Sequence, residues 1–241
     1  MKNGVLYLVP APLGRGDISR VVPDGVKRIV ASLDTFIVEN AKTARQYLAG
    51  LELSVPLQQI RLLVLDEHSR PEELLSLLKP LLLGKNVGLM SEAGCPAVAD
   101  PGADLIKLAH ANRIRVVPLV GPSAILLALM ASGLNGQRFA FHGYLPVTET
   151  ERRKKIAELE KNSKALDQTE IFIETPYRNR KLLQSLLETC LETTLLCLAT
   201  DITLESESIA TKRVSEWKSG LPDINKRPTV FLLYAGKDGS L

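Results

Sequence analysis

The sequence predicts an α/β fold divided into two domains. Through the first half of the chain, short apolar runs alternate with helical patterns, and this alternation indicates parallel strands joined by helical crossovers. The alternation breaks around Leu134, Asn135 and Gly136, and the following part is rich in strand patterns to its end. We therefore expect an N-terminal parallel-type α/β domain over residues 1–135 and a C-terminal mixed-sheet α/β domain over residues 136–241.

The elements of the first half follow from local patterns. Short runs rich in Val, Ile and Leu are typical of strands buried in a parallel sheet. These predicted strands are Gly4–Pro10, Phe36–Glu39, Leu62–Asp66, Val87–Ser91 and Arg115–Val120. The segments between them carry apolar residues at helical spacing. These predicted helices are Gly25–Ser32, Lys42–Leu48, Pro71–Leu83, Ala103–Asn112 and Pro122–Ser132.

The second half contains more strands than helices. Its predicted strands are Phe139–Leu145, Thr169–Glu174, Leu195–Ile202, Ile209–Val214 and Thr229–Ala235. Its predicted helices are Thr148–Lys161 and Arg178–Thr189. Because several strands follow one another without a helix between them, we expect a mixed sheet.

Composition limits the class of protein. The chain has 241 residues, of which 45% are hydrophobic, and this is enough for a sizeable core. Its three cysteines form no metal-binding pattern, and their odd number argues against a disulfide framework. Pro10 and Pro12 interrupt the N-terminal apolar run, so we expect neither a secretory segment nor a membrane span there. The net charge of +3 does not require a nucleic-acid partner. These features together predict a soluble protein of the cytoplasm.

Three loops rich in glycine and proline indicate a shared binding site. They are Pro10–Asp17, Ser91–Gly102 and Val120–Ala124, and each follows a predicted strand. In open α/β sheets, ligands bind beyond the carboxyl ends of the strands. Small residues let a ligand approach the backbone, while proline fixes the direction of a turn. Each loop alone reads as an ordinary turn, but three at one sheet edge favour a binding site.

Other kinds of site are weaker interpretations of these residues. Gly14–Gly16 is followed by no Gly-Lys-Ser/Thr, so it is not a phosphate-binding P-loop. Gly121–Ile125 lacks the second glycine of a hydrolase nucleophile elbow. Asp66, Glu67 and His68 are adjacent at a strand end and point in different directions, so we assign no metal there. Cys95 is interpreted as a small residue packed in a turn rather than a nucleophile.

Five segments, in this order and covering most of the chain, resemble the tetrapyrrole methylase superfamily. They read LYLVPAPLGRGDIS, SEAGCPAVADPG, RVVPLVGPSAILLALMASGL, FAFHGYLP and IFIETPYR. Within that superfamily the pattern is nearest to the 16S ribosomal RNA cytidine 2′-O-ribose methyltransferases. The chain departs from that family's usual residues at Glu39–Lys42, at Ser91–Pro96 and at Glu174–Arg178, where substrate is expected.

The resemblance implies a methyltransferase dependent on S-adenosyl-L-methionine, with a cofactor cleft between two domains and usually a homodimeric assembly. Superfamily members contact the cofactor through a set of positions in loops and at strand ends. The matching positions here are Leu13, Cys95, Val98, Ser123, Ala124, Ile173, Glu174, Ala199, Thr200 and Thr229.

Methyl transfer requires alignment and exclusion of water rather than a covalent nucleophile. A hydroxyl acceptor also benefits from a base, and Glu39 and Glu92, both at predicted strand ends, are the candidate carboxylates. Helix capping or solvation in a loop is the alternative role for each. Arg178 is the candidate to hold an anionic substrate, because a guanidinium binds such groups through two hydrogen bonds.

Three kinds of function stay open from the sequence. The first is methylation of a hydroxyl of ribosomal RNA, on the free RNA or on the small ribosomal subunit. The second is methylation of a small tetrapyrrole-like metabolite, and the third is a cofactor-binding regulatory protein without catalysis. For the first, basic residues would form a phosphate-binding rim. The candidates are Lys42, Arg45, Arg152, Arg153, Lys154, Lys155, Arg178, Arg180 and Lys181.

Overall fold

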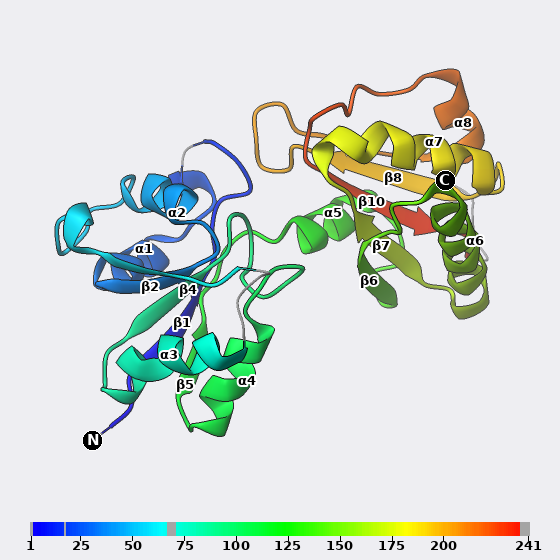
Figure 1. The fold of residues 1–241 in the computed structure, drawn as a ribbon. Helices are drawn as coiled ribbons and strands as arrows, with labels where there is room; N and C mark the ends of the chain where they lie inside the picture. The colour runs from blue at the N-terminus through cyan, green and yellow to red at the C-terminus, as the bar shows by residue number, and fades with distance from the viewer. Residues whose placement is uncertain (1, 17, 67–70, 237–241) are drawn as a thin grey trace. The chain divides into compact units, whose positions relative to one another are not determined.

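The computed structural model describes residues 2–16, 18–66 and 71–236 (Figure 1). The chain divides into two compact units, Met1–Ser123 and Ala124–Leu241. Each unit contains one five-stranded sheet, and helices pack on these sheets. The predicted fold class, a parallel α/β sheet followed by a mixed one, is confirmed.

The sheet of the first unit is parallel, with the strand order β3-β2-β4-β1-β5. Its strands are β1 (Val5–Val9), β2 (Thr35–Val38), β3 (Arg61–Val64), β4 (Val87–Met90) and β5 (Arg115–Pro118). Its helices are α1 (Asp24–Ala31), α2 (Ala41–Leu48), α3 (Pro71–Leu82) and α4 (Ala103–Ala111), with 3₁₀ turns η1 (Ile18–Arg20) and η2 (Leu57–Gln59). The strands and α-helices predicted for this part are confirmed to within a few residues at their ends.

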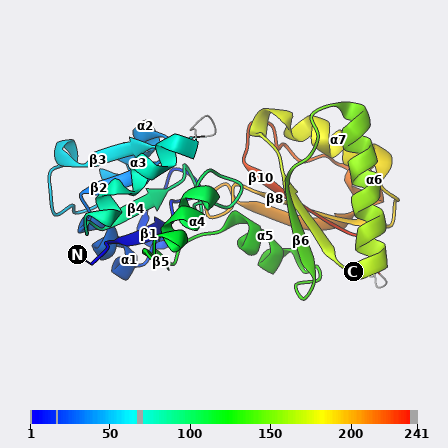
Figure 2. The same ribbon diagram turned by 60° about the horizontal axis from the view of Figure 1, so that its bottom comes forward.

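Helices cover both faces of this sheet, as Figures 1 and 2 show. Successive strand residues point to opposite faces, so the two faces build separate cores. Phe36 and Val38 pack in one core with residues of α1 and α2. Ile37, between them, packs in the other core with residues of α3 and α4. All four residues of β4 are buried, as expected for a strand covered on both sides.

The sheet of the second unit is mixed, with the order β6-β7-β10-β8-β9. Its strands are β6 (Phe139–Tyr144), β7 (Thr169–Ile173), β8 (Leu195–Thr200), β9 (Ser208–Arg213) and β10 (Thr229–Tyr234). Only the pair β6 and β7 is parallel among its pairings in the described chain. Its helices are α5 (Ala124–Ser132), α6 (Glu149–Leu166), α7 (Asn179–Thr189) and α8 (Val214–Ser219), with a 3₁₀ turn η3 (Pro176–Arg178).

The second unit differs from the sequence prediction in three places. Helix α6 runs on to Leu166, beyond the predicted end at Lys161. Helix α8 was not predicted, because its few residues directly follow β9 and begin with Val214, which reads as part of a strand. The compact units divide before α5 rather than after Asn135, because α5 contacts β8, β9 and β10.

Candidate functional site

Two of the three predicted loops are joined by their backbones. The Ala11 amide donates to the Gly94 carbonyl at 2.9 Å, and the Gly94 amide donates to the Ala11 carbonyl at 3.0 Å. The loops reach each other because β1 and β4 are neighbours, with Val9 opposite Met90. Gly94 has φ of +70°, and an added Cβ would lie 3.3 Å from Leu13 Cδ2. Glycine therefore suits this position both by conformation and by space.

The third loop meets the same loop through Cys95. The Cys95 thiol donates to the Pro122 carbonyl, with Sγ and O 3.5 Å apart. Gly121 passes so close to Pro10 that a Cβ there would lie 2.3 Å from Pro10 Cγ. Burial raises the pKa of the Cys95 thiol, so it stays protonated and unreactive at neutral pH. The three loops thus converge, and Cys95 packs between them.

The two candidate carboxylates lie next to each other. The Glu92 amide donates to Glu39 Oε2 at 3.3 Å, and Thr43 Oγ1 donates to Glu92 Oε1 at 2.9 Å. Helix α2 is capped by Asn40, whose Oδ1 accepts from the Lys42 amide at 2.9 Å. Because Asn40 provides the cap, Glu39 is left to face Glu92 rather than to cap the helix.

A third carboxylate, Asp100, joins this region and was missed from the sequence. Burial raises its pKa, a hydrogen bond with Ser91 opposes this shift, and the charge of Glu92 adds to it. Asp100 lies in the same Gly/Pro-rich loop as Glu92. The presence of two acidic residues in that loop is the sequence feature that could have identified it as a candidate site residue.

The backbone of the β4–α4 loop is unusual. Ala97 and Ala99 have φ of 64° and 62°, in the left-handed region that residues with a side chain rarely adopt. Such conformations persist where the surroundings impose them, and they cluster at functional sites. Here the bonds of Gly94 and Cys95 hold the start of the loop. The loop is therefore a fixed structure rather than an ordinary connection.

The predicted cofactor positions of the second unit gather at one end of its sheet. Val230 of β10 lies opposite both Ile173 of β7 and Ala199 of β8. Thr229 lies opposite Thr200, and their hydroxyl oxygens are 3.1 Å apart. The register of the sheet thus brings residues of β7, β8 and β10, which are distant in sequence, to one end of the sheet.

Glu174 and Arg178 form an ion pair just beyond β7. Glu174 Oε1 accepts from Arg178 Nε at 2.9 Å and Nη2 at 2.7 Å, and from the Thr175 amide at 2.7 Å. The Glu174 side chain is almost fully buried, so the pair is well shielded from water. Arg178 is therefore held in place by Glu174.

Arg152, the first of the four consecutive cations of α6, is not available to the predicted phosphate-binding rim. Arg152 is buried and donates to Ser185 Oγ at 3.0 Å and to the Val147 carbonyl at 2.8 Å. Arg153 pairs with Glu149 and Glu188, and Lys155 pairs with Glu158 at 2.7 Å. The helix pattern did not reveal the internal partners of Arg152, whereas Arg153, Lys154 and Lys155 stay at least partly exposed.

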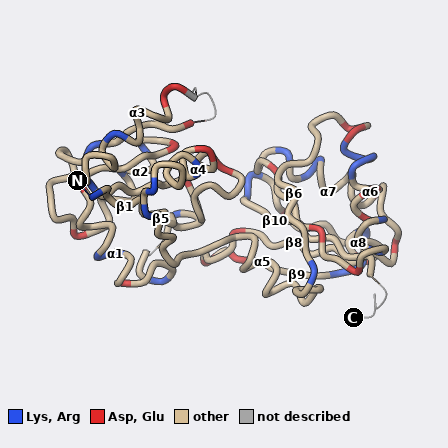
Figure 3. Tube along the Cα trace, turned by 90° about the horizontal axis from the view of Figure 1, so that it is seen from below, with Lys and Arg blue, Asp and Glu red and all other residues tan. Residues whose placement is uncertain are grey.

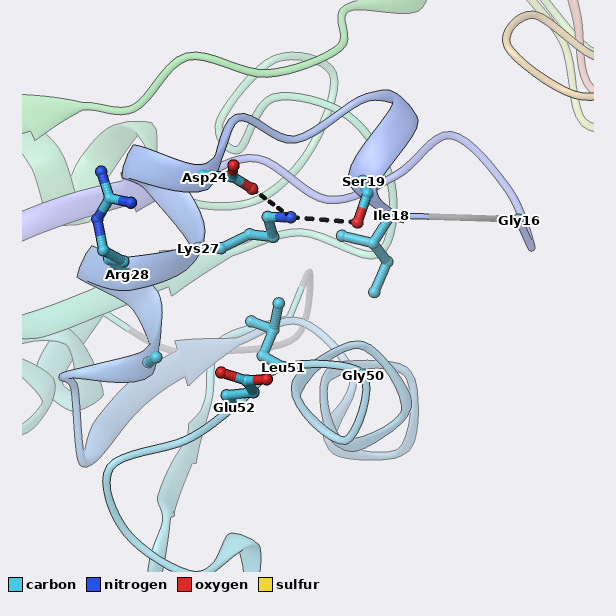
Figure 4. A pocket seen from close by; sticks show the side chains of 10 residues that line it. Gly16, Ile18, Ser19, Asp24, Lys27, Arg28, Gly50, Leu51 and Glu52 are labelled. Carbon is cyan, nitrogen blue, oxygen red and sulfur yellow. Dashed lines mark hydrogen bonds and ion pairs between the residues drawn. The ribbon is translucent and has the colours of Figure 1, made fainter.

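A cavity of about 690 Å³ lies beside the first loop (Figure 4). It shares Gly16 with that loop, and its other lining residues come from η1, α1 and the segment after α2. Lys27 is one of the lining residues, and its Nζ lies 2.6 Å from Asp24 Oδ1 and 3.1 Å from Ser19 Oγ. The converging loop residues Gly94, Cys95 and Pro122 are not among those that line it, so it is separate from the loop site.

Some sequence predictions fall outside the described residues, namely Asp17 of the first loop and the pair Glu67 and His68. Within the described chain, no group of His, Cys, Asp or Glu side chains is arranged to hold a metal ion. Nor does that part of the chain contain a helix long and apolar enough to span a membrane.

Sequence relatives identify the family. A Vibrio cholerae protein named ribosomal RNA small subunit methyltransferase I is 32% identical over 238 residues, covering 97% of this chain and 78% of that protein. The chain belongs to the ribosomal RNA small subunit methyltransferase I family. The Escherichia coli O157:H7 member is 31% identical over 89% of this chain and 71% of its own length. The Bacillus subtilis member is 33% identical over 77% of this chain and 59% of its own length. No family model matches the chain.

Solved structures share the fold at low sequence identity. The methyltransferase CobJ gives a TM-score of 0.64 at 18% identity and covers 96% of this chain and 94% of its own. Diphthine synthase gives 0.64 at 15% identity, over 96% of this chain and 89% of its own. A Thermus thermophilus uroporphyrin-III C-methyltransferase, complexed with S-adenosylhomocysteine, gives 0.56 at 15% identity, over 96% and 97%. These neighbours confirm the fold predicted from the resemblance.

Family membership also confirms two expectations from the sequence: the protein is a methyltransferase, and its cofactor is S-adenosylmethionine. The residues of the loop site fit such a molecule. Leu13 and Val98 offer partly exposed apolar surface.

We predict that Asp100→Asn raises the free energy of unfolding at pH 7. The folded-state pKa of Asp100 is raised above its ordinary 3.8, so the folded protein loses stability as pH rises from 3.8 through the raised value. Asparagine removes this charge, so its advantage is present at pH 7 and disappears below pH 3.8. Urea unfolding of both proteins across this range checks the sign, and an advantage that persists in acid would contradict the account.

Proposed function

We propose that this protein methylates a ribose 2′-hydroxyl of ribosomal RNA of the small subunit. The observation that carries the proposal is the match to a relative named for this RNA over 97% of the chain. The substrate would be the small subunit or its RNA, which places the activity in the cytoplasm.

The cofactor contacts form two groups in this proposal. In the first unit they are Leu13, Cys95, Val98 and Ser123, on or beside the converging loops. In the second unit they are Ala124 at the start of α5, and Ile173, Glu174, Ala199, Thr200 and Thr229 at the sheet end. Since Glu174 Oε1 is already held by Arg178 and Thr175, the backbone of residue 174 is the part we assign to the cofactor.

S-adenosylmethionine supplies an electrophilic methyl group when it is bound. The chain's own task is to orient the acceptor, to exclude water and to take up the hydroxyl proton. We assign the proton to Glu92, because Thr43 fixes its Oε1 and Glu39 holds its backbone amide. Glu39 and Asp100 lie beside Glu92. Arg178, held by Glu174, orients the substrate rather than taking the proton.

A small metabolite, tetrapyrrole-like in shape, is the second candidate acceptor. The internal pairing of the α6 cations favours it, because that helix then offers less charge to phosphates. The third candidate is a cofactor-binding regulator without catalysis. It differs from both methyltransferases because it would not turn over S-adenosylmethionine.

The first prediction is cofactor binding at these loops. S-adenosylhomocysteine at one hundred times its Kd should stabilise the protein by about 2.7 kcal/mol, because it binds only the folded state. Ala124→Phe should abolish this stabilisation by filling the cofactor's space, while Ala165→Phe, on the exposed part of α6, should retain it. Thermal melting with and without ligand checks the result. Equal stabilisation of all three proteins would refute the assignment.

The second prediction concerns the acceptor. Small ribosomal subunits from cells lacking this gene should gain one 2′-O-methyl group when incubated with the protein and labelled S-adenosylmethionine. Glu92→Gln should lower kcat by about 10²- to 10⁴-fold, the range typical of a lost general base. Glu52→Gln, an exposed carboxylate in the segment after α2, should leave kcat unchanged. Label confined to RNase-resistant small molecules would favour the metabolite instead.

A homodimer completes the proposal. Helix α5 is apolar along its length, and its Leu126 and Met130 are 51% and 79% exposed, so we assign it to a twofold interface. Light scattering should give twice the monomer mass of 26.4 kDa. Met130→Lys should shift the mass toward the monomer, and a monomer mass for the unaltered protein at high concentration would rule the dimer out.

A further inference from the structure

Tyr177 is an exposed aromatic residue placed beside the candidate site. Its side chain is 66% exposed, and it lies in η3 only a few residues beyond Ile173 and Glu174. An exposed aromatic ring presents a flat apolar face on which another ring can stack. It follows that the ring is available to a ligand that reaches this end of β7.

The surroundings of Tyr177 are rigid. The Arg178 guanidinium carbon lies 5.6 Å from the centre of the Tyr177 ring, and Arg178 itself is anchored by the buried Glu174. On the other side of the tyrosine, the Pro176 carbonyl accepts from the Lys226 amide at 3.1 Å. The ring is therefore carried on a turn that is fixed at both sides.

Cations surround this turn. Arg180 and Lys181 are exposed on the first turn of α7, and Lys226 is exposed on the segment bonded to Pro176. Arg180 lies 3.2 Å from Asp223, but this pair is exposed and contributes little. Figure 3 colours lysine and arginine positions blue along the Cα trace. Lys181, four residues after Tyr177, and Lys226, whose amide bonds to Pro176, thus offer positive charge close to Tyr177 along the backbone.

An exposed aromatic ring flanked by cations is the combination that binds unpaired nucleic acid. Bases stack on the ring, and lysines contact the phosphates on either side. A duplex does not fit, because its bases are already stacked on one another. Arg152 of α6 is not available for this role, because it is buried and donates to Ser185 and Val147.

We infer that Tyr177 stacks on an unpaired base of the RNA substrate, with Lys181 and Lys226 on the adjoining phosphates. This rests on the proposed RNA substrate and names the surface that binds it. Arg178 is then a positioning residue, which fixes the ring from one side. The surface lies wholly within the second unit.

Direct binding tests the surface without catalysis. The probe is a fluorescein-labelled single-stranded RNA of twelve nucleotides, measured by anisotropy with the full chain. Tyr177→Ala should raise Kd by about 5- to 150-fold, the range for one stacked base, while Tyr177→Phe should retain affinity. Lys181→Ala with Lys226→Ala should reduce the slope of log affinity against log salt by about 1.4, for two phosphates on a single strand.

The matched control is Lys164→Ala, an exposed cation near the end of α6. Lys164 lies just before the start of β7, whereas Tyr177 lies just after the end of β7. The control is therefore at the opposite end of that strand. Lys164→Ala should change neither Kd nor the salt slope. All variants should bind S-adenosylhomocysteine as the unaltered protein does, which excludes unfolding as the cause of any loss.

The outcomes separate this inference from the proposed function. RNA affinity that depends on Tyr177, without methylation of small subunits, would support the surface and refute the function. Methylation with a KM for subunits that is unchanged in Tyr177→Ala, together with unchanged affinity for the probe, would overturn the surface and leave the function standing. No binding of the probe by the unaltered protein would also overturn the surface.

Discussion

The pair of backbone hydrogen bonds between Ala11 and Gly94 is the constraint on which the candidate site depends. It fixes the loop after β1 against the loop after β4 without any side chain. The parallel pairing of those two strands brings the loops within reach, and the left-handed conformation of Gly94 lets them close. Through the next residue, Cys95, the third loop is drawn to the same place. The edge of the first sheet is therefore arranged before any ligand arrives.

This arrangement also positions the acidic groups. Glu92 lies two residues before Gly94, so its backbone is fixed by the same closure. Glu39 of the β2–α2 loop and Thr43 of α2 then hold it. Fixing these groups beforehand is what a methyl transfer needs, because the reaction gains mainly from alignment. The unusual φ angles of Ala97 and Ala99 are the local strain that accompanies this shape.

Much of the fold was predictable because its signals are local. Alternating Val, Ile and Leu runs marked the strands, and glycine and proline marked the loops at their ends. The convergence of the loops also followed from the rule for parallel sheets. What the sequence could not show was pairing between distant residues. From the sequence, Arg152 is interpreted as a surface cation, but in the structure it is buried and donates to Ser185 and to the Val147 carbonyl. The pKa of Asp100 is raised by its burial, which the sequence does not show. Helix α8 was missed because its first residue, Val214, is a strand former.

The most direct test of the account is residue-resolved hydrogen exchange with and without S-adenosylhomocysteine. The central claim is that the Ala11 and Gly94 backbones hold the loop site in shape, and that this loop binds the cofactor. We expect both amides to exchange as slowly as those of β1 and β4 in the free protein, and the amides of Cys95, Ala97, Val98 and Ala99 to slow further when the ligand is added. Rapid exchange at Ala11 and Gly94 in the free protein, or no change over residues 95–99 with saturating ligand, would contradict it.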